Sequence, residues 1–466
     1  MPSAVARLAP LLVSCVGAVA TYSFSIHGRA GGGGDDEIGH YLVARECGPD
    51  PAFVLNMWGR TVNTLCYILP AQFGIEWTRF TSLALLAVGC VFTIDLGRRL
   101  RIGPPALVAA FYWFQPWILT GAHCLTEVPF LTIQVVAFWG LAAGRYRFAG
   151  LMVGLLPLVR HEGIALAGLW GMVALVYRAW GAAVLIALPL VVQNVLYWAV
   201  FDTPAFLIFF QPKPTAAYGS GPWSHFFKLL PYRVGAVGGL AVYGLPLMLR
   251  SGLRVALAVH CGVYVTLHVV IFKFGLFASG GVVDFLVPIA PVVALAGALG
   301  CHVLAREVAG AAGRVGGAVA RWATRPRVGW LLGAAAVGVA AITTRGAPTT
   351  QNPVSQAAGQ AAAWIREQGL QNEPLEASHV TVFATLPYPV KDRVGLWSVH
   401  PRSEDMPVGT LVVWDSNYSE DSGLKRAELD GRPEWRSLAR FVVKYGDEVH
   451  SAEVFQKVGG SGPGGR

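Results

Sequence analysis

The stretch LAPLLVSCVGAVATYSFSI, residues 8–26, is followed after four glycines by DDEIGHY, residues 35–41. The first stretch approaches the roughly 20 apolar residues that cross a hydrocarbon core. Arg7 precedes it, as a basic residue precedes a cleaved signal, but the apolar run is longer than a typical signal core and many further runs follow. We therefore interpret it as a retained first helix, which places the acidic stretch where the chain first leaves the bilayer.

Composition predicts a polytopic membrane protein. Apolar residues make up 54% of the chain and charged residues only 14%, whereas soluble domains carry about 25% charged residues. The mean hydropathy is +0.51. The net charge of +9 comes mainly from arginines between apolar runs, so the sequence gives no indication of nucleic-acid binding.

The further apolar runs predict a mainly α fold with about eleven helices in all. They cover residues 80–96, 106–119, 128–143, 148–159, 164–176, 182–200, 234–249, 255–272, 282–304 and 328–342. Only Arg160-His161-Glu162-Gly163 separates the two short runs 148–159 and 164–176. Their lengths are nearer the 10 to 14 residues of a buried or re-entrant segment, so we expect a hairpin that dips into the protein.

Arginine clusters fall in alternate loops, which predicts the orientation by the positive-inside rule. Arg7 and the clusters at 98–101, 145–147, 178, 250–254 and 306–327 then lie in the cytoplasm, and the loop 27–78 lies outside. An odd number of spans places the C-terminal end outside as well. We expect a multi-pass protein of the plasma (inner) membrane; the lumenal side of the endoplasmic reticulum is the alternative.

Three domains are expected along the chain: a membrane domain over 1–345 that includes the loop 27–78, a small extracytoplasmic α/β domain over 346–458, and a disordered tail over 459–466. In the second domain, residues 356–368 have helical spacing, while 379–385 and 410–414 are strand-like. Cys47 and Cys66 share the first external loop. They could form a disulfide in an oxidising compartment or remain two small apolar side chains.

These features together resemble the GT-C superfamily of integral membrane glycosyltransferases, in particular family 39-like enzymes. The likeness rests on Asp36-Glu37 after the first helix, the alternating spans, the Arg160–Gly163 turn and the external C-terminal domain. Residues 279–288, SGGVVDFLVP, also resemble a late loop of the family, with Asp284 where Arg or Tyr often stands. The resemblance implies inverting transfer of a hexosyl or pentosyl unit from a polyprenyl-phosphate-linked donor to a lipid, glycan or protein acceptor.

Such a transfer needs a base for the acceptor hydroxyl and cations for the departing phosphate. By its position in the family motif Asp36 is the expected catalytic base, with Glu37 second. Asp35 would raise the proton affinity of its neighbour, because adjacent like charges oppose ionisation, and His40 would support the site. The alternative is a solvated acidic turn after a glycine run.

The donor phosphate is expected to bind at the Arg160 turn. Ionisable residues between apolar runs are costly at membrane depth and usually face a cavity or one another. Arg160 would bind the phosphate through its forked donors, with His161 beside it and Glu162 orienting it. Lys273 is a second phosphate candidate, unless it only snorkels to the interface. For Arg160 the alternative is an internal ion pair that closes the hairpin.

A divalent metal cation is a further candidate. His123 and Glu127 would share a helix face, because they lie four residues apart. Together with Asp36 they could bind a metal, since His and carboxylate ligands suit several metals. The alternative is a helix cap by Thr126 with Glu127 in the first turn.

Two other classes of function stay open. A transporter or flippase of a lipid-linked or small polar substrate would also have many helices and buried charges, and would show inverted repeats. We find no internal repeat, and the large external loop and terminal domain favour an enzyme. A non-catalytic membrane scaffold is the third class.

Overall fold

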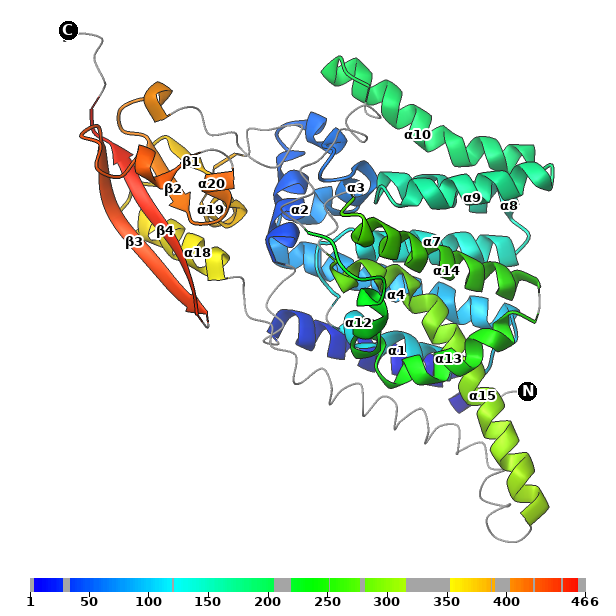
Figure 1. Ribbon diagram of the computed structural model, residues 1–466. Helices are drawn as coiled ribbons and strands as arrows, with labels where there is room; N and C mark the ends of the chain where they lie inside the picture. The colour runs from blue at the N-terminus through cyan, green and yellow to red at the C-terminus, as the bar shows by residue number, and fades with distance from the viewer. Residues whose placement is uncertain are drawn as a thin grey trace. The chain divides into compact units, whose positions relative to one another are not determined.

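The computed structural model describes residues 4–27, 34–119, 121–204, 219–250, 252–276, 281–315, 353–386, 388–389, 403–421, 424–445 and 447–459. The chain divides into two compact units (Figure 1). Residues 1–30 and 79–348 form the first, here called the membrane unit, and residues 31–78 and 349–466 form the second, here called the composite unit.

Five segments of the described chain are long and apolar enough to cross a bilayer, which confirms a multi-pass membrane protein. They lie in α1 (Ala4–Tyr22) with η1 (Ser23–His27), α4 (Ile75–Arg99), α10 (Trp180–Phe201), α14 (Gly252–Lys273), and η5 (Val283–Ile289) with α15 (Ala290–Val315). Each of these segments agrees with an apolar run of the sequence. The expected span at 328–342 lies outside the described residues.

Shorter helices fill the rest of the membrane unit. They are α5 (Pro105–Trp113), α6 (Pro116–Leu119), α7 (Glu127–Ala142), α8 (Tyr146–Leu155) with η3 (Leu156–Leu158), α9 (Gly163–Val176), α12 (His225–Val234) and α13 (Ala236–Met248). The single span expected at 106–119 is wrong, because the helix stops before Pro116, which has no N–H to continue the ladder. The Gln115 side chain satisfies the carbonyls of Phe111 and Ala290, at 2.8 and 3.0 Å.

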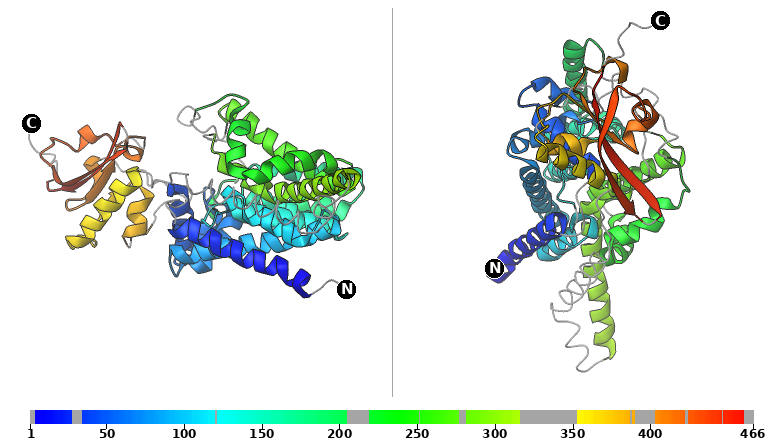
Figure 2. Two further views of the ribbon diagram at one scale, coloured as in Figure 1. Left: turned by 90° about the horizontal axis from the view of Figure 1, so that it is seen from below. Right: turned by 90° about the vertical axis from the view of Figure 1, so that its left-hand side faces the viewer.

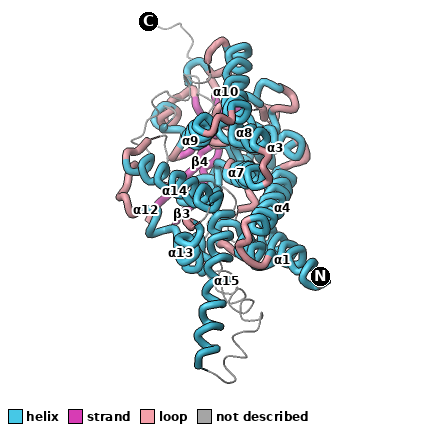
Figure 3. The backbone as a smooth tube through the Cα atoms, turned by 90° about the vertical axis from the view of Figure 1, so that its right-hand side faces the viewer, coloured by secondary structure: helices cyan, strands magenta, loops and turns pink. Residues whose placement is uncertain are grey.

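α8 is packed between α7, α9 and α10, as the end-on view in Figure 3 shows. Two glycines set its distance from α10. A Cβ on Gly150 would lie 2.7 Å from the carbonyl oxygen of Ala182, and one on Gly154 would lie 2.5 Å from that of Ile186. Small residues at such crossings let membrane helices approach closely and gain van der Waals contact. Any larger residue would force α8 and α10 apart.

The composite unit joins helices from the first loop to a sheet from the C-terminal segment. The loop contributes α2 (Gly34–Glu46), η2 (Pro51–Leu55) and α3 (Thr61–Ala71). The C-terminal segment contributes α18 (Pro353–Glu367), β1 (Leu375–Ala377), α19 (Val380–Thr385), η6 (Ser403–Asp405), β2 (Leu411–Asp415), α20 (Tyr418–Asp421), η7 (Arg426–Glu428), β3 (Trp435–Tyr445) and β4 (Glu448–Lys457). The sheet order is β1-β2-β4-β3, in which only β1 and β2 are parallel. α18 lies along one face of this sheet (Figure 2).

Two of the three elements expected in the C-terminal segment are present. Residues 356–368 fall largely in α18 and 410–414 in β2, but the strand expected at 379–385 is the helix α19. His379 caps this helix, since its ring nitrogen Nδ1 accepts a hydrogen bond from the Thr381 amide at 3.3 Å. That cap lets a β-branched run form one and a half turns of helix instead of a strand. Of the tail expected to be disordered, residues 460–466 lie outside the described residues.

The first loop and the C-terminal segment share one hydrophobic core. Leu42 and Val43 of α2 are buried with Ala357 and Ala361 of α18 and with Val413 of β2. The loop 27–78 was expected to belong to the membrane domain, whereas in the structure its residues 31–78 cluster with residues 349–466. Burial of apolar side chains from both segments explains this, because neither segment buries these faces alone.

Cys47 and Cys66 are free thiols in this unit. Burial is the main cause that raises the pKa of Cys47 to about 12, and the neighbouring Asp50 and Glu46 add to it. The structure therefore agrees with the alternative of two unpaired small side chains.

Candidate functional site

The three consecutive acids, which were expected in an external loop, form the first turn of α2. Carboxylates are favoured there because the N-terminal end of a helix carries a partial positive charge, and Arg45 in the last turn suits the opposite end. Glu37 points inward and is 1% exposed, whereas Asp36 is exposed. Of the two residues expected to act as base, only Asp36 is open to solvent within the composite unit.

Asp35 is held by side chains from the C-terminal segment. Ser355 donates its hydroxyl to Oδ1 at 2.5 Å, and Tyr418 donates its hydroxyl to Oδ2 at 2.9 Å. The ring nitrogen Nε2 of the fully buried His379 lies 3.6 Å from Oδ2. Both carboxylate oxygens of Asp35 are thus bound by the protein itself, so Asp35 fixes the start of α2.

The other end of α2 is fixed in the same way. The Arg45 guanidinium donates to the carbonyl oxygens of Phe383 and Tyr388, at 3.2 and 3.0 Å, and to the carboxylate of Glu46. With both ends bound to residues of the C-terminal segment, α2 holds Asp36 in a defined place. A positioned carboxylate is what general-base catalysis requires.

His40 supports this helix from inside the composite unit. Its ring stacks on Trp58 with the centroids 4.2 Å apart, and its Nδ1 lies 3.3 Å from the side-chain amide nitrogen of Asn63. The side chain is buried. His40 therefore fixes α2 against the η2–α3 region rather than facing solvent beside Asp36.

Arg160 forms a buried ion cluster in the membrane unit. It donates to the carboxylates of Glu127 and Glu162 and, at 2.8 Å, to the hydroxyl of Thr126. Its Nε–H also points to Glu162, at 3.3 Å. These contacts occupy four of the five N–H donors that a guanidinium carries. The turn before α9 is thereby tied to the start of α7.

The surroundings of Arg160 leave little space for a ligand beside its guanidinium. Its guanidinium carbon lies 4.5 Å from the ring centroid of Phe285 in η5, and all three ionised side chains are about 5–6% exposed. Two carboxyl groups face one guanidinium, so the cluster does not present excess positive charge to a phosphate. This arrangement is the internal ion pair that the sequence left as an alternative for Arg160.

Two other cationic or potentially cationic side chains are more accessible. His161 is partly exposed, with Nε2 3.7 Å from Glu162. Lys273, in the last turn of α14, is partly exposed and makes no hydrogen bond or ion pair with the other described residues. Asp284 of η5 is paired with Arg233 of α12 at 3.1 Å. Of the side chains expected to bind the phosphate, Lys273 is therefore partly exposed and without an ion pair among the described residues.

The expected metal ligands are arranged differently from the prediction. His123 lies in the turn before α7, and Glu127 is the first residue of that helix, so the two do not share a helix face. Thr126 makes no side-chain cap hydrogen bond, because its hydroxyl binds Arg160 and Glu127. Within the described ranges no three His, Cys, Asp or Glu side chains come together as metal ligands do. A metal requirement stays a prediction.

Comparison with solved structures identifies the fold. The crystal structure of ArnT from Cupriavidus metallidurans bound to undecaprenyl phosphate matches 97% of this chain and 98% of its own, with a TM-score of 0.64. The chain has the ArnT-like GT-C fold. Sequence identity is 15%, so the likeness concerns the fold. No family model matches the sequence, and a search of curated proteins finds no similar one.

Several residues that build this fold were not expected from the sequence. Ser355 and Tyr418 are polar residues of a polar domain, and nothing in their neighbourhood marks them as partners of Asp35, 320 and 383 residues away. His268 could have been named as a candidate from the sequence, since it is an ionisable residue within an apolar span. It is fully buried, with Nε2 3.8 Å from Glu162.

Proposed function

We propose that this chain is a membrane glycosyltransferase that moves a sugar from a polyprenyl-phosphate-linked donor to an extracytoplasmic acceptor. The observation that carries the proposal is the GT-C fold, shared over nearly the whole chain with a protein solved with undecaprenyl phosphate. The exposed Asp36 on a doubly anchored helix, directly after the first span, supports the same function. The acceptor is a lipid, glycan or protein.

On the donor side, Lys273 and His161 bind the phosphate in this proposal. Both side chains are partly exposed, and Lys273 makes no ion pair with the other described residues. Cationic groups stabilise the charge that develops on a departing phosphate. Arg160 acts mainly as a positioning residue, because four of its donors hold Glu127, Glu162 and Thr126.

On the acceptor side, Asp36 is the general base in this proposal. The acceptor oxygen forms a bond to the anomeric carbon while the bond from that carbon to the phosphate oxygen breaks. The acceptor proton passes to the Asp36 carboxylate, and polyprenyl phosphate leaves with the bonding electron pair. Attack from the face opposite the phosphate inverts the anomeric centre. Glu37 is buried and Asp35 is bound by Ser355 and Tyr418, so Asp36 is the favoured base.

The proposed orientation places the N-terminus in the cytoplasm and the composite unit outside the plasma membrane. The arginine-rich loops support this direction.

Turnover of donor tests the function. Purified protein is given polyprenyl-phosphate-linked sugars with an extract of envelope acceptors, and free polyprenyl phosphate is measured by mass spectrometry. We expect its release by wild type and a hundred- to ten-thousand-fold slower release by Asp36→Asn. Glu76→Gln is the matched control, because Glu76 is also an exposed acid in the first turn of a helix.

A deletion strain identifies the substrate. The sugar-loaded lipid should accumulate when the enzyme is missing, and its mass gives the sugar. If reconstituted protein carries the loaded lipid across vesicles and never releases polyprenyl phosphate, the chain is a flippase and the proposal is wrong.

A further inference from the structure

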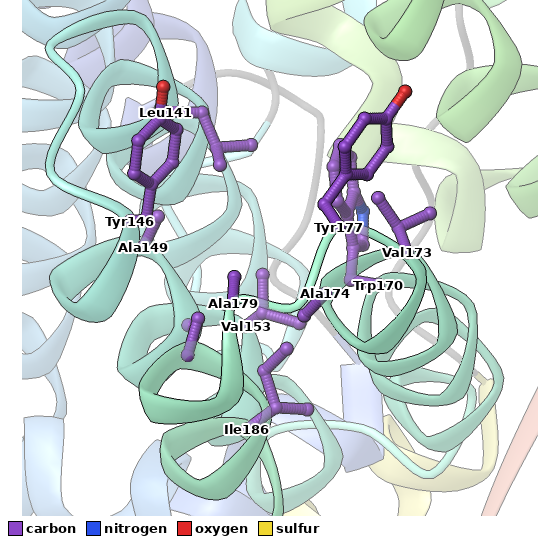
Figure 4. Close-up of a pocket in the computed structure, with 12 residues that line it drawn as sticks. Leu141, Tyr146, Ala149, Val153, Trp170, Val173, Ala174, Tyr177, Ala179 and Ile186 are labelled. Atoms are coloured by element: carbon purple, nitrogen blue, oxygen red, sulfur yellow. The ribbon is translucent and has the colours of Figure 1, made fainter.

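An apolar pocket opens between α8, α9 and α10, next to the end of α7. Its volume is about 150 Å³, and its lining is almost entirely apolar. Figure 4 shows Tyr146 on one side and Trp170 and Tyr177 on the other, with Val153 and Ile186 between them. A cavity of about this volume with apolar walls stays dry and takes up apolar molecules. The pocket therefore suits a hydrocarbon group.

The pocket walls are fixed by contacts of their own. The Trp170 indole donates at 3.0 Å to Nδ1 of the buried His260, which holds one wall. Gly150 lets α8 touch the backbone of α10 at Ala182, which closes the base. A preformed site binds its ligand without the cost of ordering loops. The pocket is thus a built feature of the membrane unit.

Three arginines lie next to lining residues in the sequence. Arg145 and Arg147 flank Tyr146 in the sequence, and Arg178 lies between Tyr177 and Ala179, which both line the pocket. The Arg147 side chain lies against Gly181 at the start of α10, since a Cβ on that glycine would meet Nε at 2.9 Å. The side chains of Arg145, Arg147 and Arg178 are all exposed.

The mouth of the pocket lies at the other end of α9 from the Arg160 turn. α9 begins at Gly163, three residues after Arg160, and ends at Val176, next to Tyr177. At 1.5 Å per residue, the start of α9 lies about 20 Å along the helix axis from the pocket mouth at Tyr177 and about 10 Å from the lining residue Trp170. An occupant of the pocket is therefore a bilayer lipid and not the reacting end of the donor.

We propose that the pocket holds an acyl chain of an anionic phospholipid whose phosphate lies against Arg147 and Arg178. The guanidinium fork suits phosphate oxygens, and basic pockets between membrane helices bind anionic headgroups. Tyr146 and Tyr177 are 60% and 80% exposed, as aromatic residues at a membrane interface are. The lipid would fasten three helices of which two, α8 and α9, are too short to span a bilayer alone.

Lipid retention tests the pocket. Wild type and variants are purified in detergent, incubated with phosphatidylglycerol or with phosphatidylcholine of the same chains, and the bound lipid is counted by native mass spectrometry. Val173→Trp fills the pocket from its partly exposed rim and should lower bound phosphatidylglycerol at least tenfold. Val176→Trp is the control on the same helix, because Val176 is 78% exposed and outside the lining.

Headgroup preference tests the arginines. Replacing both Arg147 and Arg178 by Gln should lower the preference for phosphatidylglycerol over phosphatidylcholine about thirtyfold, from roughly 1 kcal/mol for each arginine. Arg98→Gln removes an exposed arginine outside the pocket, on α4. It should change the preference for phosphatidylglycerol less than threefold. Equal retention of the two lipids by wild type, or an equal effect of the control, would overturn the proposal. So would displacement of phosphatidylglycerol by polyprenyl phosphate in the wild type but not in Val173→Trp.

Discussion

Replacement of Arg160 by Met separates the two roles that this residue could have. The variant keeps much of the side-chain volume and removes the guanidinium that lies between Glu127 and Glu162, whose side chains are 6% and 5% exposed. Removing one partner of a buried ion pair costs about 3 to 5 kcal/mol, because a charge is left buried without compensation. For a unit of this size such a loss lowers the melting temperature by something on the order of 10 °C.

Thermal unfolding in detergent, followed by the fluorescence of a thiol-reactive dye, measures this loss. A triple variant that adds Glu127→Gln and Glu162→Gln to Arg160→Met should recover most of the stability, since no buried charge remains. Lys273→Met is the contrasting control. It should leave the melting temperature within about 2 °C, because Lys273 has no ion pair among the described residues, and it should lower donor affinity instead.

One result would refute this reasoning. If Arg160→Met has the melting temperature of the wild type and only its affinity for polyprenyl phosphate falls, then Arg160 is a direct phosphate ligand and not a positioning residue. The Glu127 and Glu162 variants would then be expected to change affinity in the opposite direction, by removing competing acceptors.

Three further predictions concern the remaining features. Asp36→Asn should bind donor as wild type does and express normally, so the rate loss falls on kcat; unchanged kcat with a raised KM would assign Asp36 to binding. Tyr418→Phe removes one hydrogen bond to Asp35 and should lower the free energy of unfolding of the composite unit by about 1 kcal/mol. Limited proteolysis would detect this loss, and an unaltered cleavage rate of the composite unit would show that the bond adds nothing. Reporter fusions at Ala52 and after Gly346 should both be active outside the cytoplasm; opposite compartments would contradict the helix count.

The helices of the membrane unit were predictable because, in lipid, each apolar run must satisfy its own backbone N–H and C=O groups, which a helix does. Where this constraint is local, the prediction holds, as it does for α4 and α14. It failed at Pro116, where the run stays apolar but the backbone cannot continue the helix. Hydropathy alone does not register a missing N–H.

The contacts of the candidate site were less predictable, because they join distant parts of the chain. The sequence showed that Arg160 needed a partner and supplied Glu162 two residues away, but Glu127 comes from another helix. Asp35, Ser355 and Tyr418 meet only when the first loop and the C-terminal segment share a core. A single sequence carries no signal for such pairings. The strand expected at 379–385 failed for a similar reason, since a side-chain cap decided the local structure.

The composite unit imposes an order on biosynthesis. Its first part is made early, and about 270 residues of membrane unit must follow before its second part appears. At the usual 5 to 20 residues per second this delay is roughly 15 to 55 s. During that time Leu42 and Val43 lack the partners that cover them in the finished protein. A chain that stops early would leave α2 unanchored and its apolar face open to protease surveillance.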